Sequence, residues 1–312
     1  MKCAQCILRS QIDRSIFSTI SLLPKTGRNG LSGNFPSELA KITSLQALRF
    51  PSNLFSGTIP SEYGDMRLQT FDVNSNAIVG TIPSNFFDSR GMEMGYFNVS
   101  NNFLRGPLPF SDDVQFYAPG LTSLDFSGNM ITGTIPSEFV SALPSLSKFH
   151  LDRNFLTGSI PTELAVITSC RELSLGGNKI TGSIPSEIGL MTYLDELDLS
   201  RLALTGPIPE EFYIGLTNLR IWRLESNLLT GSISATMGNM SGLEGVYFQN
   251  NQLSGQIPTE LSNLSKLRTL ALSGNNLDGV MPLEICDGLP ELEFLSADCL
   301  DELECVCCHR CY

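Results

Sequence analysis

The hydrophobic positions of this chain recur at intervals of 23 to 27 residues. Each copy begins with three apolar residues, for example Leu121, Leu124 and Phe126. The last two members of the triplet are two residues apart, which is the spacing of inward side chains on a β-strand. One such strand cannot bury its own apolar edge, so we expect stacked copies to share a continuous core.

Each triplet is followed by Asn, Gly and Pro at fixed positions. Gly is followed three residues later by Pro in ten copies, at Gly33, Gly57, Gly80, Gly106, Gly133, Gly158, Gly182, Gly206, Gly255 and Gly279. Gly231 has Ser234 in place of Pro, and Leu202 replaces the Asn that stands four residues before each Gly. Gly permits a tight backbone path, and Pro opens a short helical segment. A column of Asn side chains pairs turn backbone, so Leu202 predicts an unpaired group that costs about 1 to 3 kcal/mol.

The motif L-x-x-L-x-L-x-x-N-x-L-x-G-x-I-P resembles the plant-specific extracellular leucine-rich repeat over about 45–295. The resemblance implies an α/β fold, a right-handed leucine-rich repeat solenoid with a parallel concave β-sheet and short helical or 3-10 segments on the convex side. We expect a solenoid of about eleven repeats at 21–297. A degenerate or truncated segment, 1–20, precedes it, and a cysteine-rich cap, 286–312, overlaps its last repeat. This cap resembles the ending of diatom-type secreted repeat proteins.

The cysteines and the glycosylation sequons indicate an oxidising, secretory compartment. Six cysteines cluster near the end, at Cys286, Cys299, Cys305, Cys307, Cys308 and Cys311. The resemblance implies three disulfides among them with the pairing open, and zinc bound by the last four with His309 is the alternative. Cys170 takes the first apolar position of its repeat, which predicts a buried thiol. The sequons begin at Asn98, Asn239 and Asn263.

Composition excludes several classes of function. With 20 basic against 32 acidic residues the net charge is -12, which disfavours nucleic-acid binding. No apolar run is long enough for a membrane span, and the first residues lack the apolar core of a signal peptide. We therefore expect an extracellular or cell-surface protein whose signal or anchor lies in a missing N-terminal segment. We expect no cofactor and no metal, and the lack of phosphate-loop, kinase or nucleophile-elbow motifs predicts a non-catalytic protein.

Residues that flank the inward apolar positions point out of the concave sheet and follow no repeat. The candidate ligand-binding residues among them are Asp125, His150, Asp152, Glu172, Asp195, Asp198, Arg220, Arg223, Glu225 and Tyr247. Mixed charge with an aromatic side chain is typical of a specific recognition surface, although any solvated sheet is polar. Trp222 occupies an inward position and is predicted to lie in the core. The double change of Arg220 and Arg223 to Ala is expected to weaken ligand binding without lowering the melting temperature.

Three functional hypotheses follow from the resemblance and the surface. The first is a receptor-like recognition module without a kinase domain, which binds a protein, peptide or glycan on its concave face together with a co-receptor kinase. The second is an inhibitor of a secreted wall-degrading enzyme, as polygalacturonase-inhibiting proteins are. The third is an ice-binding protein, suggested by the Ser and Thr residues that flank Gly133, Gly158, Gly182 and Gly231.

Overall fold

The computed structural model of the chain describes residues 30–87, 93–110 and 118–297, and the backbone of 19–21, 303–304 and 310–311. The chain divides into two compact units, Met1–Leu156 and Thr157–Tyr312. Every described repeat contributes one short strand to a long parallel sheet, and most add a second strand and a short helix. Each unit is therefore a leucine-rich repeat solenoid.

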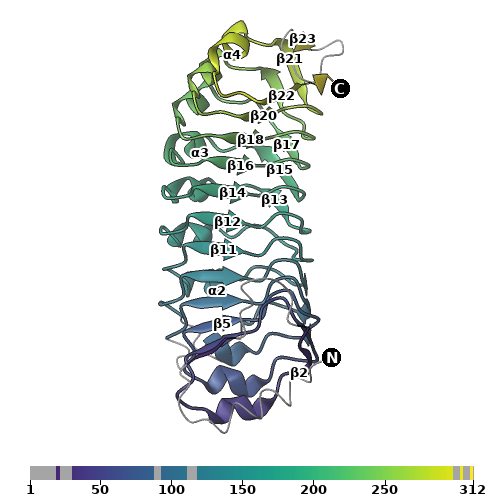
Figure 1. Ribbon diagram of the computed structural model, residues 1–312. Coiled ribbons are helices and arrows are strands. Elements are labelled where there is room, and N and C mark those ends of the chain that lie inside the picture. Colours follow the sequence, from purple (N-terminus) through teal and green to yellow (C-terminus); the bar gives the residue numbers. More distant parts are fainter. Residues whose placement is uncertain are drawn as a thin grey trace. The chain divides into compact units, whose positions relative to one another are not determined.

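The long sheet lies at the strand predicted for each repeat. In the first unit its strands are β1 (Thr19–Ser21), β3 (Ala47–Arg49), β5 (Thr70–Asp72), β7 (Tyr96–Asn98), β9 (Ser123–Asp125) and β11 (Lys148–His150). In the second unit they are β12 (Glu172–Ser174), β14 (Glu196–Asp198), β16 (Ile221–Arg223), β18 (Gly245–Tyr247), β20 (Thr269–Ala271), β22 (Phe294–Ala297) and β24 (Arg310–Cys311). Equivalent residues of successive strands pair in parallel, as Leu197 pairs with Trp222. This register stacks the strands within each unit (Figure 1).

Shorter sheets form after the Asn of each repeat. Those of the first unit comprise β2 (Ser32–Asn34), β4 (Leu54–Ser56), β6 (Val79–Gly80), β8 (Phe103–Gly106) and β10 (Met130–Ile131). Those of the second unit comprise β13 (Thr181–Ser183), β15 (Ala203–Pro207), β17 (Leu228–Thr230), β19 (Ser254–Gln256), β21 (Asn276–Val280) and β23 (Leu303–Glu304). The Gly of the motif has positive φ, as in Gly182 with φ 88°, and only Gly adopts this conformation without strain.

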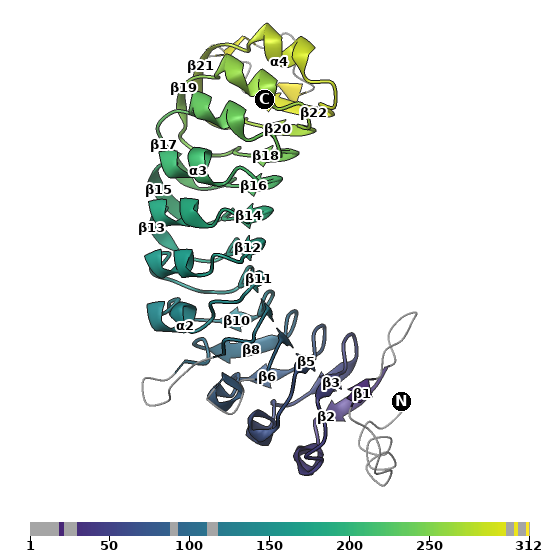
Figure 2. The ribbon, with the colours of Figure 1, turned by 90° about the vertical axis from the view of Figure 1, so that its left-hand side faces the viewer.

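Short helices begin directly after the motif Pro. The first unit contains η1 (Ser37–Lys41), η2 (Ser61–Asp65), η3 (Ser84–Phe87) and α2 (Ser137–Ser141), where η denotes a 3-10 helix. The second contains η4 (Thr162–Val166), η5 (Ser186–Leu190), α3 (Glu210–Gly215), η6 (Ala235–Asn239), η7 (Thr259–Asn263) and α4 (Leu283–Gly288). In the second unit the helices and the long sheet lie on opposite sides of each turn (Figure 2).

The Glu that follows the motif Pro by two residues has a structural role. It lies in the first helical turn at Glu38, Glu62, Glu138, Glu163, Glu187, Glu211, Glu260 and Glu284. A carboxylate there faces the positive end of the helix dipole. In the imperfect copy, Ser234 keeps the extended conformation of Pro, and its Oγ accepts a hydrogen bond from Thr236 N. Many of the acidic residues thus serve the scaffold.

The Asn column forms the predicted ladder between repeats. Asn129 Oδ1 accepts from Leu104 N at 3.0 Å, and its Nδ2 donates to Val99 O and Phe126 O. Leu202 interrupts the ladder, and among the described residues no hydrogen bond pairs the buried Ile180 N, which the missing Asn would have paired. The turn itself is retained, because Arg201 has the positive φ found at the same position in other repeats.

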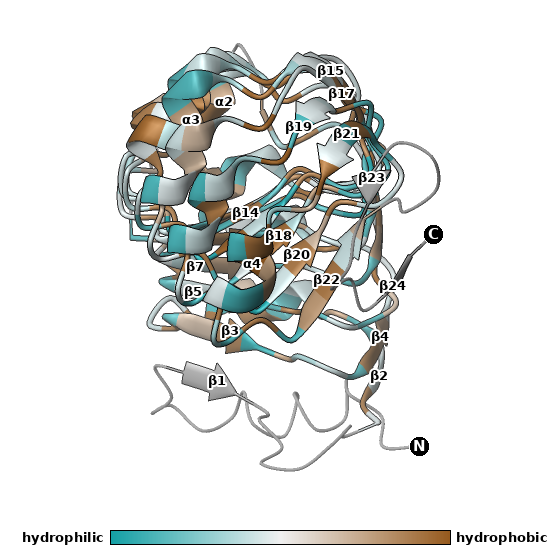
Figure 3. Cartoon of the chain, turned by 90° about the horizontal axis from the view of Figure 1, so that it is seen from above, coloured by the Kyte–Doolittle hydropathy of each residue, from teal (hydrophilic) through white to brown (hydrophobic). Residues whose placement is uncertain are grey.

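The core lies between the long sheet and the helices, where the apolar segments gather in the view along the stack (Figure 3). Trp222 is 0% exposed, so its predicted place in the core is confirmed. Phe86 and Phe87 of η3 are also buried. Cys170 is a buried free thiol, and burial raises its pKa to about 12. That thiol is therefore inert at neutral pH.

Candidate functional site

The residues that can meet a ligand on the long sheet occupy three columns. Each strand points its first and third residues outward and its second inward. The residue two positions after the strand's third residue continues the outward alternation. We call these three columns together the outer face. Asp125, His150 and Asp152 belong to the outer face of the first unit. Of the seven candidates in the second unit, five belong to its outer face, and Asp195 and Arg220 directly precede their strands.

Polar side chains of the first unit's outer face bind their own backbone. Asp125 Oδ1 accepts from Ser127 N at 3.0 Å and from Ser127 Oγ at 2.6 Å. Asn98 Oδ1 accepts in the same way from Ser100. These bonds fix the chain where it leaves the strand. The predicted ligand residue Asp125 thus already has a structural task.

The other two candidates of the first unit lie on the next strand. His150 is the third residue of β11, in register with Asp125, and it is half-buried. Asp152 Oδ2 accepts from Arg153 Nε at 3.0 Å, in an ion pair between neighbours in sequence. The unit does bring the three candidates onto adjacent strands. Asp125 and Asp152, however, already accept hydrogen bonds from residues close to them in sequence.

A row of alternating charge borders the second unit's outer face. The residues that precede successive strands are Arg171, Asp195, Arg220, Glu244, Arg268 and Glu293. Arg220 donates from Nε and Nη2 to the two carboxylate oxygens of Glu244, both at 2.9 Å. Arg171 pairs with Asp195 at 3.3 Å. Because each pair cancels its own charge, Asp195 and Arg220 belong to an ion-paired border.

The centre of that outer face holds an arginine and a tyrosine in contact. The Arg223 guanidinium carbon lies 4.2 Å from the centroid of the Tyr247 ring. A Cβ at Gly245 would lie 2.9 Å from Tyr247 Cε2, so the ring is folded back over that glycine. On the preceding strand Asp198 Oδ1 accepts from Ser200 N at 2.9 Å. Glu172, on β12, is half-buried and in register with Glu196.

Two acceptor oxygens of this face are buried without a hydrogen-bond partner among the described residues. They are Glu225 Oε2 and Gln249 Oε1. Both residues follow the third strand position by two, and Arg223 pairs in register with Tyr247, so Glu225 and Gln249 lie on adjacent strands. Burial is the main cause that raises the pKa of Glu225, and repulsion from Asp198 adds to it. A hydrogen bond to its own backbone and the charge of Arg223 lower the pKa. Buried acceptors without donors are uncommon, because desolvation is then uncompensated.

A hollow of about 410 Å³ lies beside Gln249. Ala271, Ser273 and Ser296 line it together with Phe294. The third column changes from Arg223 and Tyr247 to Ala271 and Ser296, and small side chains leave this space open. Its volume falls in the range typical of small-ligand pockets.

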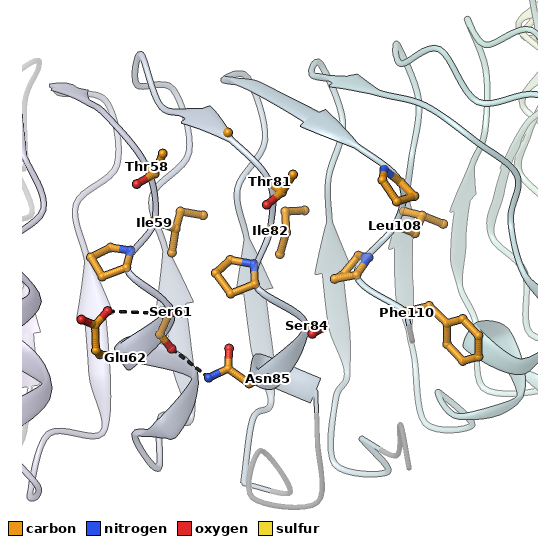
Figure 4. A pocket seen from close by; sticks show the side chains of 15 residues that line it. Thr58, Ile59, Ser61, Glu62, Thr81, Ile82, Ser84, Asn85, Leu108 and Phe110 are labelled. Atoms are coloured by element: carbon orange, nitrogen blue, oxygen red, sulfur yellow. Dashed lines mark hydrogen bonds between the residues drawn. The ribbon is translucent and has the colours of Figure 1, made fainter. Parts of the chain in front are cut away.

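A larger trough of about 970 Å³ in the first unit belongs to the scaffold (Figure 4). Thr58, Ile59 and their counterparts Thr81 and Ile82 in the next repeat line it, and Asn85 Nδ2 donates to a backbone oxygen across it at 2.8 Å. The second unit has a similar trough of about 550 Å³ at the same motif positions. A feature that recurs with the motif follows from the repeat itself, so the non-repeating hollow is the better candidate.

The predicted modifications fall at separate places. Cys286 is disulfide-bonded, and the side chains of Cys299, Cys305, Cys307, Cys308 and Cys311 lie outside the described residues. Asn239 and Asn263 are exposed at the ends of η6 and η7. Asn98 is 8% exposed and its Nδ2 donates to Tyr96 Oη at 3.1 Å, so a sugar there would require that bond to break.

The Ser and Thr residues proposed for ice binding are exposed, and only Thr181, Ser183 and Thr230 among them lie on short strands. Their array is irregular in the second unit, where Thr181 pairs with Ala203 and Thr230 with Pro207. Within the described residues there is no group of His, Cys, Asp and Glu that could hold a metal ion. No helix in that part of the chain has the length and apolarity to cross a bilayer.

Sequence reasoning found the neighbourhood of the candidate site but missed the hollow. Ala271, Ser273 and Ser296 carry no recognition chemistry of their own, so they were not singled out. The signal was a loss of side-chain size along the outward columns. The aromatic Phe294, at the first and outward position of β22, was a second signal.

The class of protein defined by this fold is the leucine-rich repeat solenoid, and the comparisons agree. The leucine-rich repeat family model matches residues 120–142, 169–191, 242–264 and 266–287. The chain carries repeats similar to those of plant receptor ectodomains. It is 34% identical over 122 residues to serine/threonine-protein kinase BRI1-like 1 of Arabidopsis thaliana, a stretch that covers 39% of this chain and 10% of that protein.

Two solved receptors share the fold over most of the chain. A TDR receptor superposes with a TM-score of 0.80 at 26% identity, covering 97% of this chain and 55% of the receptor. The Arabidopsis receptor kinase HAESA, solved with the peptide hormone IDA and the co-receptor SERK1, gives a TM-score of 0.71 at 30% identity, covering 87% and 50%. The chain thus spans about half the length of these receptor structures.

Proposed function

We propose that this protein is a non-catalytic recognition module of the extracellular space or cell surface that binds a peptide on the outer face of its second unit. The observation that carries the proposal is the group formed by Arg223, Tyr247, Glu225 and Gln249. It combines an arginine, an aromatic ring and two buried acceptor oxygens that lack partners among the described residues. Tyr and Arg are the side chains most enriched at binding hot spots.

The relatives support a peptide as ligand. The receptor kinase HAESA was solved with a peptide hormone and a co-receptor. An extended peptide suits a parallel-strand face, because its alternate side chains can address successive strands. A receptor-like role without a kinase of its own, with a co-receptor kinase as second partner, is part of the proposal.

The test is selection of binding peptides from a displayed random library, followed by hydrogen-exchange mapping. Selected peptides should protect the backbone of β16, β18 and β20. The variant Arg223→Ala should lose about tenfold or more in affinity with an unchanged melting temperature. Protection confined to the short sheets or to the trough of Figure 4 would refute the proposed face.

Arg220→Ala is the matched control, because its guanidinium is held in the border pair with Glu244. We expect it to change affinity less than twofold. Equal losses for the two arginines would show that the border, not the centre, makes the contact. The inhibitor and ice-binding alternatives are tested separately, by a panel of pectinases and by thermal hysteresis.

A further inference from the structure

The hollow beside Gln249 differs in chemistry from the rest of the outer face. It is lined by the small residues Ala271, Ser273 and Ser296 and by the aromatic Phe294. The two serine hydroxyls lie 3.4 Å apart, close enough to share one hydrogen bond. Sharing one proton leaves acceptor capacity on both oxygens.

One side-chain oxygen of the hollow's lining, and one in the neighbouring repeat, lack a donor among the described residues. Gln249 Oε1 is buried and accepts no hydrogen bond from the described residues, and Glu225 Oε2 on the adjacent strand is in the same state. A carboxylate ligand would bring further lone pairs against these oxygens. A ligand with several N–H groups would satisfy them, and a positive charge would also complement Glu225.

The shape and the aromatic side narrow the choice to a flat cation. A guanidinium presents five N–H donors in a plane and stacks on aromatic rings, whereas an ammonium is a compact and strongly hydrated charge. Phe294 offers such a ring at the side of the hollow. Arg223 lies over the neighbouring Tyr247 ring, so that arginine is already held on an adjacent strand.

We propose that the hollow lined by Gln249, Ser273 and Phe294 binds an arginine side chain of the peptide ligand. The inference rests on the proposed function, because it assumes that a peptide lies on this face. It adds that one residue of the bound peptide is an arginine. Glu225 supplies the negative charge nearest to Gln249 along the same column.

The direct test uses a small probe rather than an unidentified ligand. N-acetyl-arginine methylamide is titrated into the full chain and followed by saturation-transfer NMR, beside the citrulline and glutamate analogues. We expect millimolar binding of the arginine probe, at least about tenfold weaker binding of neutral citrulline, and none of glutamate. Equal binding of citrulline, or preference for glutamate, would overturn the proposal.

Two variants test whether the probe binds in the hollow. Ser273→Phe fills the space and should abolish binding, and Gln249→Leu removes the buried acceptor and should weaken it about tenfold. Glu196→Gln, an exposed carboxylate at the first position of β14, is the matched control and should leave binding unchanged. Binding that survives both Ser273→Phe and Gln249→Leu, in variants with wild-type circular dichroism, would refute the site.

The same variants separate this inference from the proposed function. Library peptides that protect β16 to β20, lack basic residues and still bind Ser273→Phe would refute the arginine site and leave the peptide-binding face intact. Peptides that protect no part of the outer face would refute the proposed function. An arginine preference lost in Ser273→Phe supports both.

Discussion

In the first unit, the side-chain oxygens of Asp72, Asn98 and Asp125 accept hydrogen bonds from residues two positions later in their own repeats. In the second unit, Glu225 Oε2 and Gln249 Oε1 are buried and accept none from the described residues. Two residues after the strand, the first unit has Asn74, Ser100 and Ser127, which donate to the third strand residue. Ser200 of the second unit keeps this pattern with Asp198, but Glu225 and Gln249 replace the donor in the next two repeats. A polar group that binds its own backbone stabilises the fold, and one left without a donor remains available to a ligand.

The interiors of the two units differ as well. Phe97 in the first unit lies in a cluster with Phe71, Phe86, Phe87 and Phe126, with ring centroids 5.0 to 5.7 Å away. The second unit places Leu, Val and one Trp at the inward strand positions, and the rings of Phe212, Tyr213 and Phe248 contact Trp222. Offset and edge-to-face ring pairs add stability beyond the area they bury. One repeat motif thus accommodates two kinds of core.

The largest effect that would test this comparison is removal of the central ring of the first unit. Phe97→Ala should lower the free energy of unfolding by about 3 to 5 kcal/mol, because it leaves a cavity among four other rings. Val246→Ala at the same strand position of the second unit should cost clearly less. Urea unfolding followed by circular dichroism measures both, and equal losses would show that the aromatic cluster adds nothing special.

Removing a self-bonded carboxylate should also cost stability. Asp125→Ala takes the acceptor from Ser127 N and from the Ser127 hydroxyl, whose residue is only 5% exposed, so we expect a loss of about 1 to 2 kcal/mol. The same substitution at Glu225 removes only the bond of its carboxylate to its own backbone N–H and none to the following turn. If both variants unfold at the same urea concentration, the distinction between the two outer faces is wrong.

The gap in the Asn ladder distinguishes the second unit further. Leu202→Asn should give the buried Ile180 N an acceptor and so raise the free energy of unfolding by about 1 kcal/mol. The loss of the buried leucine side chain offsets part of this gain. Asn227→Leu, which breaks an intact rung, should destabilise. Thermal unfolding of the two variants measures the difference, and a loss of stability in Leu202→Asn would mean that local packing has replaced the rung.

How far the sequence predicts this molecule depends on whether a position repeats. The strands, the short helices, the Asn ladder and the core place of Trp222 were predictable, because each obeys a period that recurs through the chain. The partners of Arg220 and Arg223 were not, since the two arginines differ by three residues and only the register shows that one meets Glu244 and the other Tyr247. The hollow was hidden for the same reason, because an absence of side chains becomes a shape only when strands are stacked.

The smallest effect, and the sharpest test of the unpartnered acceptor, is the pH dependence of Glu225. Burial raises the pKa of Glu225 in the folded chain, and repulsion from Asp198 adds to the rise. A hydrogen bond to its own backbone opposes the rise, as do Arg223 and Arg201. Between the ordinary and the raised pKa the folded chain binds more protons than the unfolded chain, so stability falls as pH rises through this window and stays lower above it. Glu225→Gln should therefore match the wild type below the ordinary pKa of glutamate and melt higher at neutral pH, by at most about 2 °C because the residue is half-buried. Melting curves from pH 4 to pH 8 measure this, with Glu196→Gln as the exposed control. A Glu225→Gln variant that melts lower than the wild type at neutral pH would mean that the carboxylate has a stabilising partner, and that the outer face of the second unit satisfies its polar groups as the first unit does.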